Sequence, residues 1–171
     1  MIWRKKQNEV TLRKCGSGAW RKTSVAWQPD GWGEAMTAPA AELQQAIFAV
    51  LGADPVLTGL LGGAKIYDDA PANLPFPYLT FGRTSVYDWS TGTEKGSEHL
   101  FTLHIWSKAK GKKETLDIME AAKACLDNSP LALDAHHLVN MRLEFAEARY
   151  DDDLSVHHGL LRYRAVIEEA A

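Results

Sequence analysis

The clearest pattern along the chain is helical spacing of apolar residues just after residue 36. In the segment 37–55, TAPAAELQQAIFAVLGADP, the periodic positions are Leu43, Ile47, Val50 and Leu51. Their spacing, with a proline suited to a first turn, predicts an amphipathic helix. Asp54 is placed to cap a second, short helix that a following glycine pair would stop. The sequence therefore predicts two consecutive helices, with a short strand after them at 65–67.

From residue 78 onward, apolar and polar residues alternate with the period of two that is typical of strands. A strand over 78–87 is expected to turn back through a long tip into a second strand at 101–106. A third helix follows, and two further strands flank the turn YDDDLS. The inward positions read from the pattern are Ile118, Met119, Ala122, Cys125 and Leu126 on the helix, Val139, Met141, Leu143 and Phe145 on the next strand, and Leu161, Tyr163, Ala165 and Ile167 on the last.

This order of elements, α-α-β-β-β-α-β-β, predicts an α+β fold. We expect a mainly antiparallel sheet of about five strands with helices packed on one face. A chain of 171 residues is long enough for one domain with a real core. The opposite sheet face is expected to be amphipathic and available for binding, and its residues are Arg142, Glu144, Arg162, Arg164, His104 and Trp106.

The first 35 residues differ from the rest of the chain. They hold four of the six tryptophans and a net charge of +4, which leaves −7 for the remainder of a chain of net charge −3. They lack periodic patterning, so we read them as an extension to a domain at 36–171. Three interpretations are open: a basic arm, disordered until it folds on a partner; a short accessory hairpin; or sequence upstream of a true start at Met36. The last is favoured, because a self-sufficient domain begins there.

The residues that could carry chemistry do not form a reaction centre. The two cysteines, Cys15 and Cys125, are too few for a disulfide framework or a cysteine zinc site. Adjacent histidines at 136–137 and 157–158 point to opposite faces of a strand, which argues against a metal site. Nucleophile-elbow, Walker and dinucleotide motifs are absent from the sequence. We therefore predict no enzyme activity, no cofactor and no metal.

Neither a bilayer-spanning apolar run nor a secretory signal is visible in the sequence, which favours a cytosolic protein. The stretch DWSTGTEKGSEHLFTLHIWSKAKGKKE begins at Asp88 and raises one choice, between a catalytic loop and a protein contact surface. Its lysines could face phosphates or an acidic neighbouring protein, although lysine runs in loops usually aid solubility.

Several stretches together resemble a known family. They are ELQQAIFAVLGADPVLTGLLGGAKIYDDAP, FPYLTFG, DWST, GSEHLFTLHIWS and HHLVNMRLEFAEARYDDDLSVHHGLLRYRAVIE. In order and spacing they resemble the tail terminators, or tail-completion proteins, of siphophage-like prophages and gene transfer agents. The resemblance covers about residues 41–168 and excludes the first 35. It implies a structural virion protein of α+β fold, and it answers the choice above in favour of a contact surface.

The resemblance further implies that six copies form a ring on the last ring of tail-tube protein, where they end tube growth and meet the head connector. A ring needs two different complementary patches on each subunit. Large aromatic residues are good anchors for such patches. The expected interface residues are Trp89, Glu94, Lys95, Trp106, Lys110 and Lys112. DNA would be cargo only. The net charge of −7 on residues 36–171 fits a channel lumen to which DNA does not bind.

The implied location is the bacterial cytoplasm during assembly and then the head-proximal end of a tail, without any membrane partner. Two alternatives stay open. One is a head-to-tail joining, or neck, protein at the same general location. The other is a small nucleic-acid-binding module that uses the basic arm and the KAKGKK loop. Binding by such a module would weaken steeply with salt.

Overall fold

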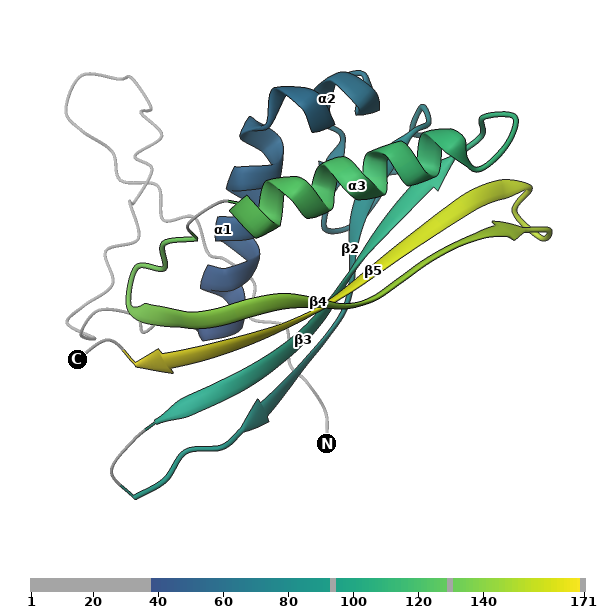
Figure 1. Cartoon of the computed structure of the whole chain (residues 1–171). Helices are drawn as coiled ribbons and strands as arrows, with labels where there is room; N and C mark the ends of the chain where they lie inside the picture. The colour runs from purple at the N-terminus through teal and green to yellow at the C-terminus, as the bar shows by residue number, and fades with distance from the viewer. Residues whose placement is uncertain (1–37, 93–94, 129–130, 170–171) are drawn as a thin grey trace, which may run out of the picture. The chain divides into compact units, whose positions relative to one another are not determined.

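The computed structural model of the chain describes residues 38–92, 95–128 and 131–169 (Figure 1). All of them belong to the compact unit Met36–Ala171. The helices are α1 (Pro39–Ala53), α2 (Pro55–Leu61) and α3 (Lys113–Asn128). The strands are β1 (Ile66–Tyr67), β2 (Tyr78–Asp88), β3 (Gly96–Ser107), β4 (His136–Asp151) and β5 (Val156–Glu169). Their order along the chain is the one that the sequence predicts.

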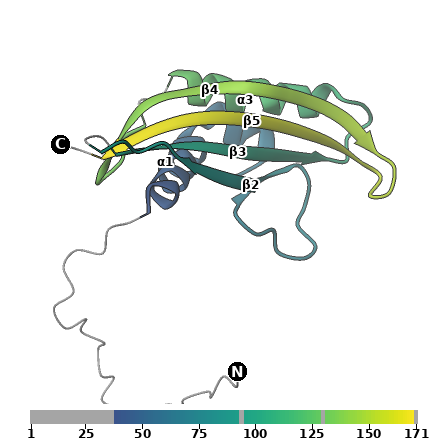
Figure 2. The ribbon, with the colours of Figure 1, turned by 90° about the horizontal axis from the view of Figure 1, so that it is seen from below.

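The five strands form one sheet in the order β1-β2-β3-β5-β4. β1 runs parallel to β2, and every other neighbouring pair is antiparallel. The helices lie on one face of this sheet (Figure 1). Figure 2 looks onto the other face, which no helix of the described part of the chain covers. The predicted α+β class, with helices on a single face of a mainly antiparallel sheet, is confirmed.

The first two helices form for the local reasons that the sequence suggests. Pro39 occupies the first turn of α1, where its missing N–H costs nothing. Asp54 Oδ1 accepts a hydrogen bond of 2.6 Å from the N–H of Leu57 and caps α2, an interaction of about 1 kcal/mol. α2 ends at Gly62, whose φ of 68° lies in the left-handed region that favours glycine.

The hydrophobic core lies between the helices and the sheet. Its fully buried side chains include Ile47, Leu51, Leu57, Leu61, Leu79, Leu103, Ile105, Ile118, Leu161, Tyr163 and Ile167. Each large aliphatic side chain contributes about 1.5–3 kcal/mol by leaving water. Cys125 lies on the inner side of α3, as predicted for a packing residue, with its Sγ 3.5 Å from the carbonyl oxygen of Val50.

Among the described residues, none of the helices alone has the length and apolar character to cross a membrane. The pair α1–α2 passes that test by length and composition only, and it bends by 78° at its junction. Leu43, Ile47, Leu51, Leu57 and Leu61 of this pair belong to the core described above, whereas Phe48, Val56 and Leu60 are exposed.

Two register shifts in β4 overturn part of the predicted pattern. One lies at Val139 and the other between Leu143 and Phe145. Val139 is 47% exposed and Phe145 is 44% exposed, so the expectation that both share the inward face of Met141 and Leu143 is wrong. A bulge adds a residue to one strand and moves the side chains after it to the other face. Phe145 consequently pairs with Arg162 across the strands, and the guanidinium lies 5.6 Å from the ring centroid.

The two hairpin tips lie at opposite ends of the sheet (Figures 1 and 2). β3 pairs with β5 along its whole length, from Gly96 opposite Glu168 to Ser107 opposite His157. The tip of the β2–β3 hairpin therefore lies beside the end of β5, and the tip of the β4–β5 hairpin lies at the other end. A strand of 12 residues separates the two ends by about 40 Å.

Candidate assembly interfaces

The tip of the β2–β3 hairpin is organised around Trp89. The indole ring covers Gly96, where any Cβ atom would overlap the ring. The N–H of Trp89 donates a hydrogen bond of 3.2 Å to the carbonyl oxygen of Gly96, which closes the hairpin. The side chain is nevertheless 38% exposed. Trp89 is therefore held in place by its own hairpin while it offers an aromatic surface outward, as an interface anchor does.

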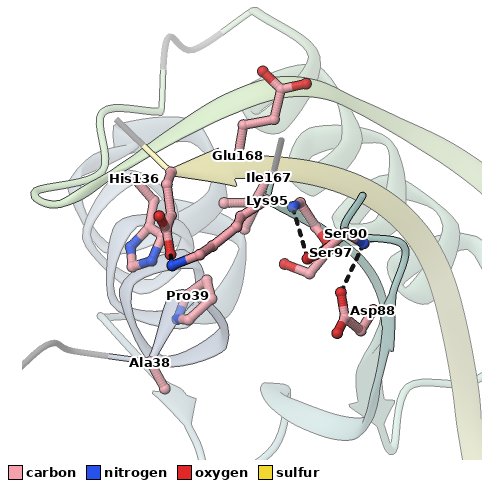
Figure 3. Close-up of a pocket in the computed structure, with 11 residues that line it drawn as sticks. Ala38, Pro39, Asp88, Ser90, Lys95, Ser97, His136, Ile167 and Glu168 are labelled. Carbon is pink, nitrogen blue, oxygen red and sulfur yellow. Dashed lines mark hydrogen bonds and ion pairs between the residues drawn. The ribbon is translucent and has the colours of Figure 1, made fainter. Parts of the chain in front are cut away.

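Polar contacts fix the backbone around this tryptophan. Asp88 Oδ1 accepts a hydrogen bond of 2.8 Å from the N–H of Ser90, and hydrogen bonds from Ser90 hold the pKa of the Asp88 carboxyl below its usual range. Lys95 Nζ lies 3.1 Å from Glu169 Oε1 at the end of β5. Asp88, Ser90 and Lys95 line a hollow of about 260 Å³. Figure 3 shows these three residues around it. Glu94, the third residue predicted here, lies outside the described residues.

A buried carboxylate ties α1 to the start of β4 beside this hollow. Glu42 is 4% exposed, and its Oε2 lies 3.1 Å from His136 Nδ1. The N–H of Ala135 donates to the same oxygen at 3.1 Å. Burial works to raise the pKa of Glu42, but the hydrogen bonds from Ala135 and His136 outweigh it and leave the pKa lowered. The carboxylate thus anchors the helix layer to the sheet at the end where the Trp89 tip lies.

Trp106 is embedded in the uncovered sheet face. Its ring stacks on His158 at a centroid distance of 4.2 Å, and its Nε1–H donates to Thr80 Oγ1 at 3.1 Å. His104 Nδ1 lies 2.7 Å from His158 Nε2, so one imidazole donates to the other. Burial, followed by the charge of Arg149, lowers the pKa of His104, and burial likewise lowers the pKa of His158. Two neutral rings and an indole therefore form a packed patch.

The predicted lysines lie in the connection between β3 and α3, at the same end of the sheet as Trp106. Lys110 and Lys112 are both exposed. Two hydrogen bonds hold the loop that carries them. The N–H of Gly111 donates to His157 Nε2 at 3.2 Å, and the N–H of Ala109 donates to Ser107 Oγ at 3.0 Å. The described interface candidates thus form two groups, Trp89 with Lys95 at one end and Trp106 with the two lysines at the other. Their role in contacts stays a prediction.

A third surface is an open hollow of about 390 Å³ on the uncovered face, which we term the arginine hollow. Leu100 and Leu160 are its partly buried apolar members, and Arg83 and Arg162 are its exposed cations. Ser85, Thr102, Tyr87 and His104 complete the lining.

The sequence indicated only part of the arginine hollow. Arg162 belongs to the predicted charged face, but Arg83 was missed because a register shift between Phe81 and Thr84 displaces it from simple alternation. Gly82, inside an otherwise regular strand pattern, is the signal that could have revealed this shift.

Metal chemistry finds no support in the part of the chain that the structure describes, where no group of three or more His, Cys, Asp or Glu residues is placed to hold an ion. His104 and His158 contact each other across the neighbouring strands β3 and β5. The spacing of histidines along one strand does not reveal such a contact.

Comparison with solved structures places this fold among virion components. A protein in the virion of a native gene transfer agent particle is 31% identical with a TM-score of 0.66, and the match covers 77% of this chain and 98% of that one. The gp17 protein of bacteriophage SPP1 has a TM-score of 0.51 at 20% identity, over 77% of this chain and 91% of that one, and it supports the fold. The match to the gene transfer agent protein identifies the chain as a component of a phage-like virion particle.

The family follows from sequence comparison. The profile of the family "Tail completion protein gp17" matches residues 45–168, and the chain belongs to this family. The tail completion protein gp17 of Bacillus phage SPP1 is 26% identical over 93 residues, which are 54% of this chain and 69% of that protein. The chain is accordingly a tail completion protein of a phage or gene transfer agent virion, and it is not an enzyme.

Proposed function

We propose that the protein forms a ring on the head-proximal end of a phage-like tail tube, ends tube growth there and presents a surface to the head connector. The observation that carries this proposal is the placement of two separate groups of interface candidates at opposite ends of one sheet in a tail completion protein. A subunit that joins two unlike neighbours needs such a separation. The length of β3, about 40 Å, supplies it.

Trp89, Glu94 and Lys95 are proposed to contact a neighbouring subunit or the tube protein. Trp89 supports this role because it is exposed yet fixed over Gly96, so little side-chain freedom is lost on contact. At the other end of the sheet, Trp106 is proposed to contribute by shaping the sheet face. Its ring packs on His158, so it is not a free anchor. Lys110 and Lys112, on a loop fastened to His157, are proposed to face an acidic partner surface at the other end.

We further place six copies in the ring, with DNA passing through its lumen only as cargo. The net charge of −7 on residues 36–171 supports this, because a negatively charged lumen repels DNA and does not retain it. The protein would be made in the bacterial cytoplasm and join the particle during tail assembly.

The test is the tail-length distribution, by negative-stain electron microscopy, of a producing strain from which the gene has been deleted. A terminator is expected to leave overlong, headless tubes that return to one length when the gene is restored. Headless tails of normal length would indicate a neck protein instead. Tails of normal length attached to filled heads would refute both roles.

The same strain tests the proposed contacts. The combined variant Trp89→Ala with Glu94→Ala and Lys95→Ala is expected to restore tail length poorly, although its purified chain folds. Lys123→Ala is the matched control, because this lysine lies on α3 and pairs with Glu120 at 3.6 Å, away from the tip. Equal restoration by both variants would remove the tip from the interface.

A further inference from the structure

The arginine hollow is a surface without a charge partner in the part of the chain that the structure describes. On the same face, Arg164 pairs with Glu98 and Arg142 pairs with Glu144. Within the described residues, by contrast, neither Arg83 nor Arg162 forms an ion pair. Arg83 and Arg162 line the hollow together with the apolar residues Leu100 and Leu160. The chemistry that fits this hollow is a carboxylate next to an aliphatic side chain.

The β4–β5 hairpin presents that chemistry at its tip. The acidic tip, which we define as Asp152, Asp153 and Leu154, carries two exposed carboxylates and a leucine that is 59% exposed. Asp151 Oδ1 accepts a hydrogen bond of 3.0 Å from the N–H of Leu154 and closes the turn. The tip is therefore preorganised, and docking would cost it little backbone entropy.

The tip cannot enter the hollow of its own chain. β4 and β5 stay paired up to Asp151 opposite Val156, which directs the tip along the strands and beyond the end of the sheet. Leu160, in the hollow, lies four residues along β5 from Val156, a distance of about 13 Å. An encounter between tip and hollow must therefore join two copies.

We infer that the acidic tip of one copy seats in the arginine hollow of the next, with Asp152 or Asp153 on Arg83 and Arg162 and with Leu154 against Leu100 and Leu160. Because tip and hollow are different patches, the contact is head-to-tail, and such a contact closes into a ring when the rotations from copy to copy add up to one full turn. This inference rests on the proposed ring function and names the interface that holds the ring together.

Cross-linking in assembled particles tests the contact directly. A chain with Asp153→Cys and Arg162→Cys, treated in purified particles with a short bis-maleimide, is expected to give a ladder of multimers on a denaturing gel. The native chain, treated alike, controls for Cys15 and Cys125. The pair Asp153→Cys with Lys123→Cys moves the second thiol to α3 and is expected to give no ladder. Absence of a ladder from the first pair, or linkage of position 153 to another protein, would overturn the inference.

Charge reversal gives a second, independent readout. Asp152→Arg with Asp153→Arg, or Arg83→Glu with Arg162→Glu, brings like charges together and is expected to lower incorporation into particles by about tenfold or more. All four substitutions in one chain restore opposite charges and are expected to recover incorporation. Native incorporation of either reversed chain, or no recovery in the combined chain, would refute the contact.

The two proposals fail in different ways. If the deletion strain makes overlong tubes and no ladder forms, the terminator function stands and this interface is wrong. If the ladder forms and the deletion leaves tails of normal length, the copies meet head-to-tail in a protein that does not end tube growth.

Discussion

Replacing Trp106 by alanine is expected to destabilise the fold far more than replacing Trp89, although both tryptophans were singled out as interface anchors. Trp106 is partly buried, stacks on His158 and donates a hydrogen bond to Thr80. Trp89 touches Gly96 at a hairpin tip and is 38% exposed. The two substitutions therefore separate a residue that maintains the sheet face from one that is available to a partner.

The magnitude follows from the interactions that the Trp106 side chain makes. Truncating a fully buried tryptophan to alanine costs about 3–5 kcal/mol. Trp106 is only partly buried, so we expect about 2–3 kcal/mol, of which the aromatic stacking supplies roughly 1 kcal/mol and the hydrogen bond about another. For a compact unit of this size each kcal/mol lowers Tm by about 3–5 °C, which gives a decrease of roughly 6–15 °C. Trp89→Ala is expected to cost about 1 kcal/mol or less.

The assay is differential scanning calorimetry of the purified chain, because its signal does not depend on the tryptophans themselves. Trp106→Phe is the matched control: it keeps an aromatic ring, loses the N–H donor to Thr80, and is expected to cost about 1 kcal/mol. The reasoning is refuted if Trp106→Ala lowers Tm by less than about 3 °C, or if Trp89→Ala lowers Tm as much as Trp106→Ala does.

Two further predictions concern the sheet and its anchor. Gly82→Val places a side chain against the His104 imidazole, and we expect the free energy of unfolding to fall by about 1–3 kcal/mol. The measurement is a lower urea midpoint with an unchanged m-value. Gly52→Ala is the control, because a Cβ there meets open space and is expected to cost no stability. Because the folded-state pKa of Glu42 lies below its ordinary value of 4.5, the carboxylate stabilises the fold fully above that pH and the contribution is lost as pH falls toward the lowered pKa. Glu42→Gln is therefore expected to flatten the acid limb of a stability-against-pH curve, and an unchanged limb would contradict this.

The fold was largely predictable because its local signals agree with one another. Asp54 caps α2, Gly62 ends it, and the alternation in β3 points Leu103 and Ile105 into the core, as their spacing indicates. The failures at Val139 and Phe145 come from bulges, whose position depends on how β4 pairs with β5. Periodicity along one strand carries no information about such a shift in pairing.

The candidate surfaces were less predictable, because they depend on neighbours across the sheet. The exposure of Trp89 and the position of Lys110 and Lys112 in a loop could be read from local sequence. The stacking of Trp106 on His158 could not, since it joins residues of two strands that are far apart in the chain. The arginine hollow has the same origin, because Arg83 and Arg162 meet only through the order β2-β3-β5.

The outer strand β4 has a consequence for how copies of this protein meet. It ends the sheet with 16 residues whose outer backbone groups have no strand partner within the described chain, a length that invites addition of a foreign strand. Two bulges interrupt its hydrogen-bond spacing, and Arg142, Glu144 and Arg149 place exposed charges along it. Such an edge resists growth into a continuous intermolecular sheet. We therefore expect copies that accumulate at high concentration to resist fibrillar stacking along this border, and we expect association there to use side chains.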